Sequence, residues 1–128
     1  PIDWAFKVEC CGAGFSVSRT DLVAKLSSKI LDDAVSRGAE AIVVACPMCH
    51  SNLDMRRKKI EAYAQKKFSI PVIYLTQAIG LSMGLDRKKL GLHRHKVPVK
   101  FAPVSNVPNA SPEAAREVPG KTGASASA

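Results

Sequence analysis

The stretch AIVVACPMCH, residues 41–50, decides the fold. Its first half, residues 41–45, is a continuous apolar run, which is typical of a β-strand covered on both faces, as in a parallel sheet. Its second half is a C-x-x-C motif in which Pro47 suits the first turn of a helix, because a proline there loses no hydrogen bond. A helix over about residues 52–67 is predicted to follow. The stretch therefore predicts a strand that passes directly into a helix bearing cysteines.

Patterns on both sides of this stretch continue the alternation of strands and helices. Apolar residues at helical spacing predict a helix that begins near residue 18 and is ended by Gly38. Downstream, residues 70–75 read as a strand and residues 77–85 as a short apolar helix. At the start of the chain, apolar residues alternate with others over residues 4–8, a period of two that is typical of a strand. The predicted order is β-α-β-α-β-α.

This order predicts an α/β fold, namely a Rossmann-like half with a parallel sheet of about three to four strands and flanking helices. The length of 128 residues suits one domain, and a hydrophobic content of 46% is sufficient for a core. We expect the domain to span residues 1–101. Residues 102–128 are rich in Pro, Ala and Ser and are expected to form a flexible tail.

Composition also bears on location and partners. No apolar run approaches the ~18–20 residues that a transmembrane segment needs, and no signal peptide is visible, so a cytoplasmic protein is expected. The sequence does not begin with Met, and we expect a piece of a longer protein. The net charge is +8, with basic runs at residues 56–59, 87–89 and 94–96. Because no aromatic residues interleave these runs, an acidic protein partner is favoured over nucleic acid.

The cysteines are the candidate site residues: Cys10, Cys11, Cys46 and Cys49. The first pair follows one predicted strand and the second pair follows the next. Because the carboxyl ends of parallel strands lie at one edge of a sheet, the four thiols are predicted to converge there. Four thiolates suit a zinc ion or an iron–sulfur cluster. A thioredoxin-like dithiol in the C-P-M-C motif and thiols that are merely packed in the core stay open as alternatives.

Three motifs extend beyond the cysteines: CCGAG (residues 10–14), ACPMCHSNLD (residues 45–54) and IPVIYLTQAIGLSMGL (residues 70–85). They resemble those of the CCG cysteine-rich domain family, and most of all those of the B subunit of heterodisulfide reductase. The resemblance implies a protein that splits a disulfide substrate reductively on non-cubane [4Fe–4S] clusters. It implies a ferredoxin-like C subunit and a flavin-bearing A subunit as partners. The ligands it implies are Cys10, Cys11, Cys46 and Cys49.

The family also carries an earlier cysteine and a second CCG domain, and neither is found in these residues. The resemblance therefore implies the C-terminal portion of such a protein, and we expect the isolated portion to be inactive as an enzyme. The alternative function is a non-catalytic interaction module that binds zinc through its four cysteines.

The histidines are secondary candidates. His50 follows Cys49 directly and could tune a cluster or bind substrate, but a solvated histidine at a helix start is the commoner case and is expected here. His93 and His95 flank Arg94 in a basic turn and are likewise expected to be solvated.

Overall fold

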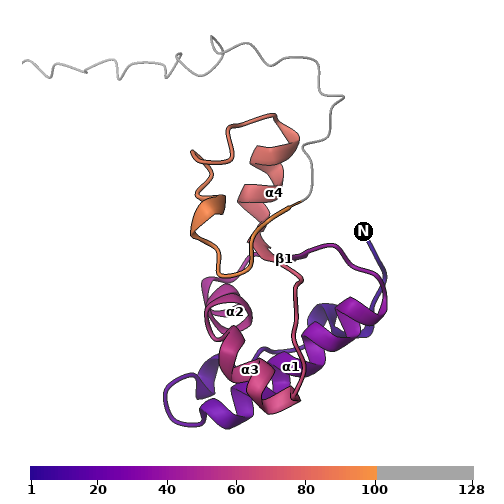
Figure 1. Ribbon diagram of the computed structural model, residues 1–128, viewed down its shortest axis with the longest axis vertical. Coiled ribbons are helices and arrows are strands. Elements are labelled where there is room, and N and C mark those ends of the chain that lie inside the picture. Colours follow the sequence, from indigo (N-terminus) through magenta and orange to yellow (C-terminus); the bar gives the residue numbers. More distant parts are fainter. Residues whose placement is uncertain (101–128) are drawn as a thin grey trace, which may run out of the picture.

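A computed structural model of the chain describes residues 1–100, so the predicted tail over residues 102–128 lies outside the described residues and the domain boundary at residue 101 stays a prediction. Helices and two short strands follow one another along the chain (Figure 1). They are α1 (Thr20–Ser36), β1 (Ile42–Val44), α2 (Pro47–His50), α3 (Arg57–Ala64), β2 (Val72–Tyr74) and α4 (Leu75–Ser82). Shorter helical turns are η1 (Ala5–Val8), η2 (Ala13–Phe15), the π-helical η3 (Ser51–Met55) and η4 (Leu92–Arg94).

The sheet of the described residues has two parallel strands, in a register that pairs Ile42 with Val72 and Val44 with Tyr74. The chain crosses from β1 to β2 through α2, η3 and α3, which is a β-α-β unit. The strands predicted over residues 41–45 and 70–75 are therefore confirmed, and so is their parallel pairing. The predicted sheet of three to four strands is not found within residues 1–100.

The first predicted strand, over residues 4–8, is wrong: Ala5–Val8 is the short 3₁₀ helix η1. The N–H of Glu9 donates to the carbonyl of Phe6 at 3.2 Å, so the backbone closes its own turn. Trp4 and Phe6 pack against the core, whereas Val8 is exposed. A strand needs a neighbour to satisfy its backbone groups, and the described residues place none beside this segment.

The core consists of two apolar clusters, one on each face of the sheet. On one face, α1 and α3 contribute Leu31, Ala34 and Ile60 to a cluster that includes residues of both strands. On the other face, Leu81 of α4 packs with Ile73 and with residues of the segment that follows α4. In Figure 1, α4 lies at the opposite end of the molecule from α1 and α3, with the strands between them. Apolar clusters thus lie on both faces of the sheet, but Val43 of β1 is exposed, so the two-sided cover that the apolar run of residues 41–45 predicts is incomplete.

The helix predicted over residues 52–67 is interrupted. The π-helical turn η3 precedes α3, and three consecutive residues of η3, namely Asn52, Leu53 and Asp54, are all buried. A regular amphipathic helix buries one stripe rather than a consecutive triplet. Such π-helical insertions occur frequently at functional sites.

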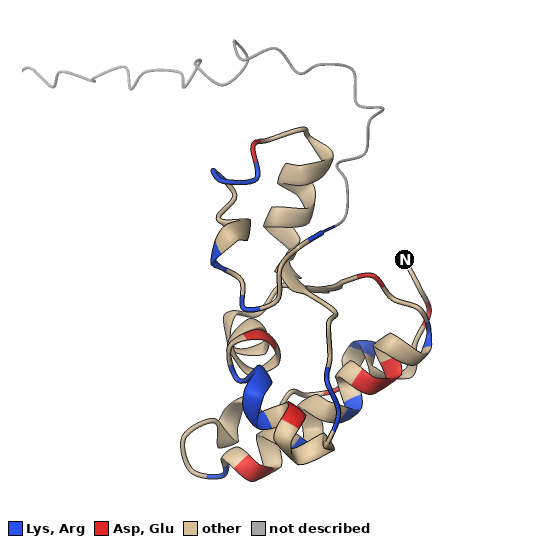
Figure 2. Cartoon of the chain, in the orientation of Figure 1, with Lys and Arg blue, Asp and Glu red and all other residues tan. Residues whose placement is uncertain are grey.

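Charge is distributed unevenly over the chain (Figure 2). Acidic and basic side chains are mixed along α1, whereas residues 86–100 carry a single acidic residue, Asp86. The basic residues of that segment are Arg87, Lys88, Lys89, Arg94, Lys96 and Lys100. Among residues 1–100, none of the helices has the length and apolar character that crossing a membrane requires.

Candidate metal centre

The turn that carries Cys10 and Cys11 is held against α1. Cys11 is buried, and its carbonyl accepts a hydrogen bond from the Ser27 hydroxyl of α1 at 3.5 Å. Gly12 has a φ of +83°, and a Cβ at this position would lie 3.1 Å from Cδ1 of Leu26. Glycine therefore allows both the left-handed backbone and the close approach to α1. Packing on a helix fixes this turn in place of the strand that the sequence predicted.

The C-x-x-C motif lies where β1 passes into α2. Cys46 has an extended backbone and precedes Pro47, the first residue of α2, as predicted. The backbone N–H groups of Cys49 and Met48 hydrogen-bond the thiol of Cys46 and lower its pKa, because N–H donors favour the thiolate. This exposed cysteine is therefore prepared for metal binding or nucleophilic attack.

Cys49 joins the two cysteine segments. Its Sγ lies 3.4 Å from Sγ of Cys11. Burial, and then hydrogen bonding to Cys11 and to Cys46, raises the pKa of Cys49 to about 12. Cys11 and Cys49 are thus in contact, and Cys46 is near enough to Cys49 to contribute to its pKa shift. Cys10 is exposed, and its Sγ accepts a hydrogen bond from the N–H of Gly12 at 3.3 Å rather than contacting another thiol of the described residues.

Asn52, which is not among the candidate residues predicted from the sequence, supports the buried thiol. Its Nδ2 donates to Sγ of Cys11 at 3.5 Å, and its Oδ1 accepts a hydrogen bond from the Ser16 hydroxyl at 3.1 Å. The side chain is fully buried in η3. An amide donor to sulfur stabilises the thiolate form, as outer hydrogen bonds do around metal ligands generally. The signal available in the sequence was a polar N-x-D three residues after the C-x-x-C motif.

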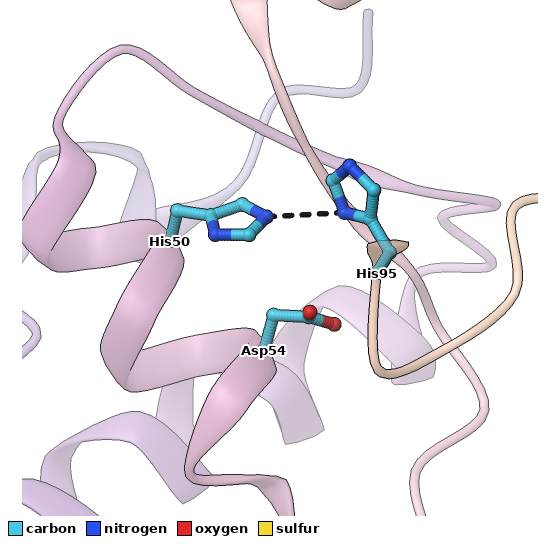
Figure 3. Close-up of side chains that lie close together, drawn as sticks. All are labelled: His50, Asp54 and His95. Atoms are coloured by element: carbon cyan, nitrogen blue, oxygen red, sulfur yellow. Dashed lines mark hydrogen bonds between the residues drawn. The ribbon is translucent and has the colours of Figure 1, made fainter. Parts of the chain in front are cut away.

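His50 lies in a second polar cluster, with Asp54 and His95 (Figure 3). His50 Nε2 is 3.0 Å from His95 Nδ1, and the His50 ring stacks on Tyr74 with ring centroids 4.4 Å apart. Both histidines are half-buried, so the prediction that they are solvated is wrong. A contact across 45 residues of sequence has no local signature. His93 is exposed, as expected.

Gln77 determines where the proton of His95 resides. Its Oε1 accepts from the backbone N–H of Tyr74 at 2.9 Å, and its Nε2 donates to the carbonyl of Leu90 at 2.9 Å. A backbone N–H can only donate and a carbonyl can only accept, which fixes the orientation of the amide. The same Nε2 lies 3.0 Å from His95 Nε2, which must therefore be the unprotonated nitrogen.

The proton of His95 is consequently on Nδ1, which lies 2.8 Å from the carbonyl of Val72 and donates to it. His50 Nε2 faces the same N–H and accepts from it in this arrangement, which places the proton of the neutral His50 ring on Nδ1. Both rings are neutral in this arrangement. Burial lowers the pKa of His50, which agrees with a neutral ring.

Asp54 joins the segment of residues 96–97 to η3 through hydrogen bonds. This buried carboxylate accepts hydrogen bonds from the backbone N–H groups of Lys96, at 2.7 Å, and Val97, at 3.3 Å. The neighbouring guanidinium of Arg57 is also buried and donates to the carbonyl of Ile70 at 2.9 Å. Burial lowers the pKa of Arg57, and the charge of Asp54 opposes that shift. Asp54 therefore satisfies two backbone donors and balances a buried cation.

The two clusters differ in what they can bind. Ligand atoms of His50, Asp54 and His95 lie within 4.8 Å of one another, a residue combination that zinc accepts. However, the proton that Gln77 places on His95 Nδ1 leaves that nitrogen without the lone pair that a metal needs. The thiols fit a metal better, because thiolates are the ligands of zinc and of iron–sulfur clusters. Backbone N–H groups and Asn52 already donate to their sulfur atoms.

Fold and site define a cysteine-rich α/β domain whose thiols meet where a strand passes into a helix. Residues 4–54 match the family described as the CCG cysteine-rich domain, and the chain belongs to this family. The match includes the Cys10–Cys11 turn, the C-x-x-C motif and Asn52, and it ends at Asp54.

Several curated proteins resemble a larger part of the chain. The B subunit of the ferredoxin:CoB-CoM heterodisulfide reductase of Methanosarcina mazei is 32% identical over 98 residues, covering 75% of this chain and 33% of that protein. A protein of Archaeoglobus profundus that is named as similar to the B subunit of heterodisulfide reductase is 33% identical over 88 residues. The match covers 65% of this chain and 28% of that protein. The membrane anchor subunit of the 8-methylmenaquinol:fumarate reductase of Wolinella succinogenes is 30% identical over 91 residues. The match covers 71% of this chain and 32% of that protein. The chain spans about one third of the length of these relatives.

Proposed function

We propose that the chain binds an iron–sulfur cluster through its four cysteines and serves as a redox domain of a protein like the B subunit of heterodisulfide reductase. The observation that carries the proposal is the Sγ–Sγ distance of 3.4 Å between Cys11 and Cys49, which lie 38 residues apart in the sequence. Thiols brought together from two separate segments suit a centre that contains several irons. The similarity to components of two differently named reductases supports a shared redox role.

Each residue of the site has a part in this proposal. Cys46 offers a thiolate readily, whereas Cys49 gives up its proton only when a metal replaces it. Asn52 donates to the sulfur of Cys11 and so stabilises its negative charge. When bound, the cluster supplies electron transfer to or from a disulfide or thiol substrate, and the resemblance to heterodisulfide reductase favours the non-cubane [4Fe–4S] type.

The proposed partners are the other components of a reductase complex. Two of the matched relatives are named as B subunits of heterodisulfide reductases, and one as a membrane anchor of a fumarate reductase. We propose a ferredoxin-like C subunit and a flavin-bearing A subunit for this chain. The basic segment of residues 86–100 would attract an acidic electron-transfer partner and speed its association.

The test is anaerobic reconstitution of the chain with iron and sulfide, followed by iron and acid-labile sulfide analysis and electron paramagnetic resonance. Cys11→Ser and Cys46→Ser should each lower bound iron at least severalfold, because a thiolate ligand is lost. His50→Ala is the matched control next to Cys49 and should retain the wild-type iron content. Binding should weaken as the pH falls, because protons compete with the metal for the thiolates.

Two results would count against the proposal. Equal iron content in wild type, Cys11→Ser and Cys46→Ser would show that the cysteines do not form one site. One zinc ion per chain, with no sulfide and no colour after reconstitution, would instead support the zinc-binding interaction module.

A further inference from the structure

The two outer edges of the sheet differ in how their backbone groups are satisfied. On the β2 side, polar side chains take the place of a further strand. The carbonyl of Ile70 accepts from Arg57 at 2.9 Å, and the carbonyl of Val72 accepts from His95 at 2.8 Å. The N–H of Tyr74 donates to Gln77 at 2.9 Å. This edge is closed, which is one way in which proteins prevent a sheet from being extended.

The outer edge of β1 has no such cover within residues 1–100. The N–H of Ile42 donates to the carbonyl of Pro71 at 2.9 Å, so Ile42 and Val44 direct their backbone groups toward β2. Val43, between them, directs its N–H and carbonyl away from β2, and neither group has a partner among the described residues. The Val43 side chain is 49% exposed, although it belongs to a continuous apolar run.

A groove of about 560 Å³ lies along this free edge. Val43 and Ile73 line it from the sheet, Trp4 and Ala34 from one side, and Ala78 and Leu81 of α4 from the other. Figure 1 shows β1 between α4 and α1. Pro1 and Ile2 of the N-terminal segment also line the groove. An occupant of the groove therefore contacts apolar side chains on both faces and unpaired backbone groups at its edge.

We propose that the free edge of β1 binds an extended apolar strand, parallel to β1, which the same protein supplies from polypeptide outside these 128 residues. Helices on both faces of a sheet accompany parallel strands that are apolar on both sides. The curated relatives are about three times as long as the part they share with this chain, so further polypeptide exists in such proteins. The inference does not depend on the cluster.

The experiment uses the 128-residue chain and a synthetic ten-residue peptide with a central Val-Ile-Val-Ile and Ser and Glu at its ends. The control peptide is identical except for N-methyl groups on two central amides, which remove its hydrogen-bond donors. We expect the first peptide to bind saturably and to slow hydrogen exchange of the Val43 amide, measured by NMR. The N-methylated peptide should bind at least tenfold more weakly.

Val43→Pro removes the outward N–H without breaking a hydrogen bond of the described residues, and should also weaken peptide binding at least tenfold. Val43→Thr, which keeps the outward N–H and a β-branched side chain, is the matched control and should bind normally. Because Val43→Pro can disturb the strand, circular dichroism checks its fold, and the N-methylated peptide tests the same contact without altering the protein.

The proposal is overturned if neither peptide binds, or if both bind equally well. It is also overturned if the chain is a dimer that Val43→Pro converts to a monomer, because a second copy would then cover the edge.

Discussion

Cys49 and His50 are neighbours in the sequence, yet they belong to two polar clusters with opposite properties. The thiols of Cys11, Cys46 and Cys49 have mainly one another and N–H donors as partners. A thiolate sulfur has three lone pairs, so it can accept a hydrogen bond from an N–H group and still bind a metal. In the cluster of His50 and His95, both ring nitrogens of His95 are already hydrogen-bonded. Its Nδ1 donates to the carbonyl of Val72, and its Nε2 accepts from the Gln77 amide. Proximity of ligand-type side chains is therefore insufficient to define a metal site, because the lone pairs must also be free.

The two clusters also connect different parts of the fold. The thiol cluster joins the Cys10–Cys11 turn to α2 and carries the proposed chemistry. The histidine cluster joins η3, β2 and the segment that follows η4, and it closes the outer edge of β2. We infer that substitutions in the first should change metal content, whereas substitutions in the second should change stability.

The largest effect is expected at Asp54. Asp54→Ala leaves the N–H groups of Lys96 and Val97 without an acceptor and removes one of the two carboxylates whose charge acts on the buried Arg57. Each buried donor that loses its acceptor lowers the free energy of unfolding by about 1–3 kcal/mol, and Asp54→Ala affects two of them. Asp54→Asn keeps one oxygen acceptor and should be less damaging, at about 1–3 kcal/mol.

Urea unfolding, followed by circular dichroism, measures both Asp54 variants. A matched surface control is Asp32→Ala, whose exposed ion pair with Lys66 should contribute little. An Asp54→Ala chain as stable as wild type would mean that the hydrogen bonds from Lys96 and Val97 to this carboxylate do not stabilise the fold.

Features that depend on neighbouring residues in the sequence could be predicted, whereas features that depend on contacts between distant segments could not. The apolar run of residues 41–45 and the C-x-x-C motif after it give the strand, the helix start and the position of Cys46, because these are local effects. The alternation over residues 4–8 misleads, because period-two spacing does not show whether a neighbouring strand is available. Convergence of Cys11 with Cys49 was predicted from two strand ends, yet the Cys11 turn is fixed by its packing on α1.

The second cluster could not be predicted in the same way. Asn52 and Asp54 are buried together because η3 is π-helical, and an apolar helical stripe gives no indication of that insertion. His95 reaches His50 only after the chain has formed β2 and α4 and turned back. Its place is therefore set by tertiary packing, which neither composition nor spacing encodes.

An intermediate effect is expected within the thiol cluster, in the metal-free, reduced chain. Hydrogen bonds from backbone N–H groups lower the pKa of Cys46, so at neutral pH more of it is thiolate, the form that reacts with iodoacetamide. Burial and the neighbouring thiols raise the pKa of Cys49 to about 12, so it remains protonated. Cys46 should therefore be alkylated at least about tenfold faster than Cys49 at pH 7.5.

Peptide mass spectrometry after timed quenching measures the two alkylation rates. Between pH 7 and pH 9 the rate at Cys49 should rise in proportion to its thiolate fraction, while the rate at Cys46 should level off sooner. In urea the difference should disappear, because the fold causes both pKa shifts. Equal rates in the folded chain would mean that the N–H groups of α2 do not act on Cys46.

The smallest effect is expected when zinc is offered to the histidine cluster alone. The chain for this test carries serine in place of its four cysteines: Cys10→Ser, Cys11→Ser, Cys46→Ser and Cys49→Ser. To bind zinc, His95 would have to move its proton from Nδ1 to Nε2, where it would face the Gln77 Nε2 donor at 3.0 Å. Rotation of the Gln77 amide would in turn break its bonds to Tyr74 and Leu90. We therefore expect no stoichiometric zinc binding by calorimetry, and nitrogen-15 NMR should show the His95 proton on Nδ1. One zinc ion per chain, lost again on adding His95→Ala, would contradict this assignment and make the second cluster a metal site.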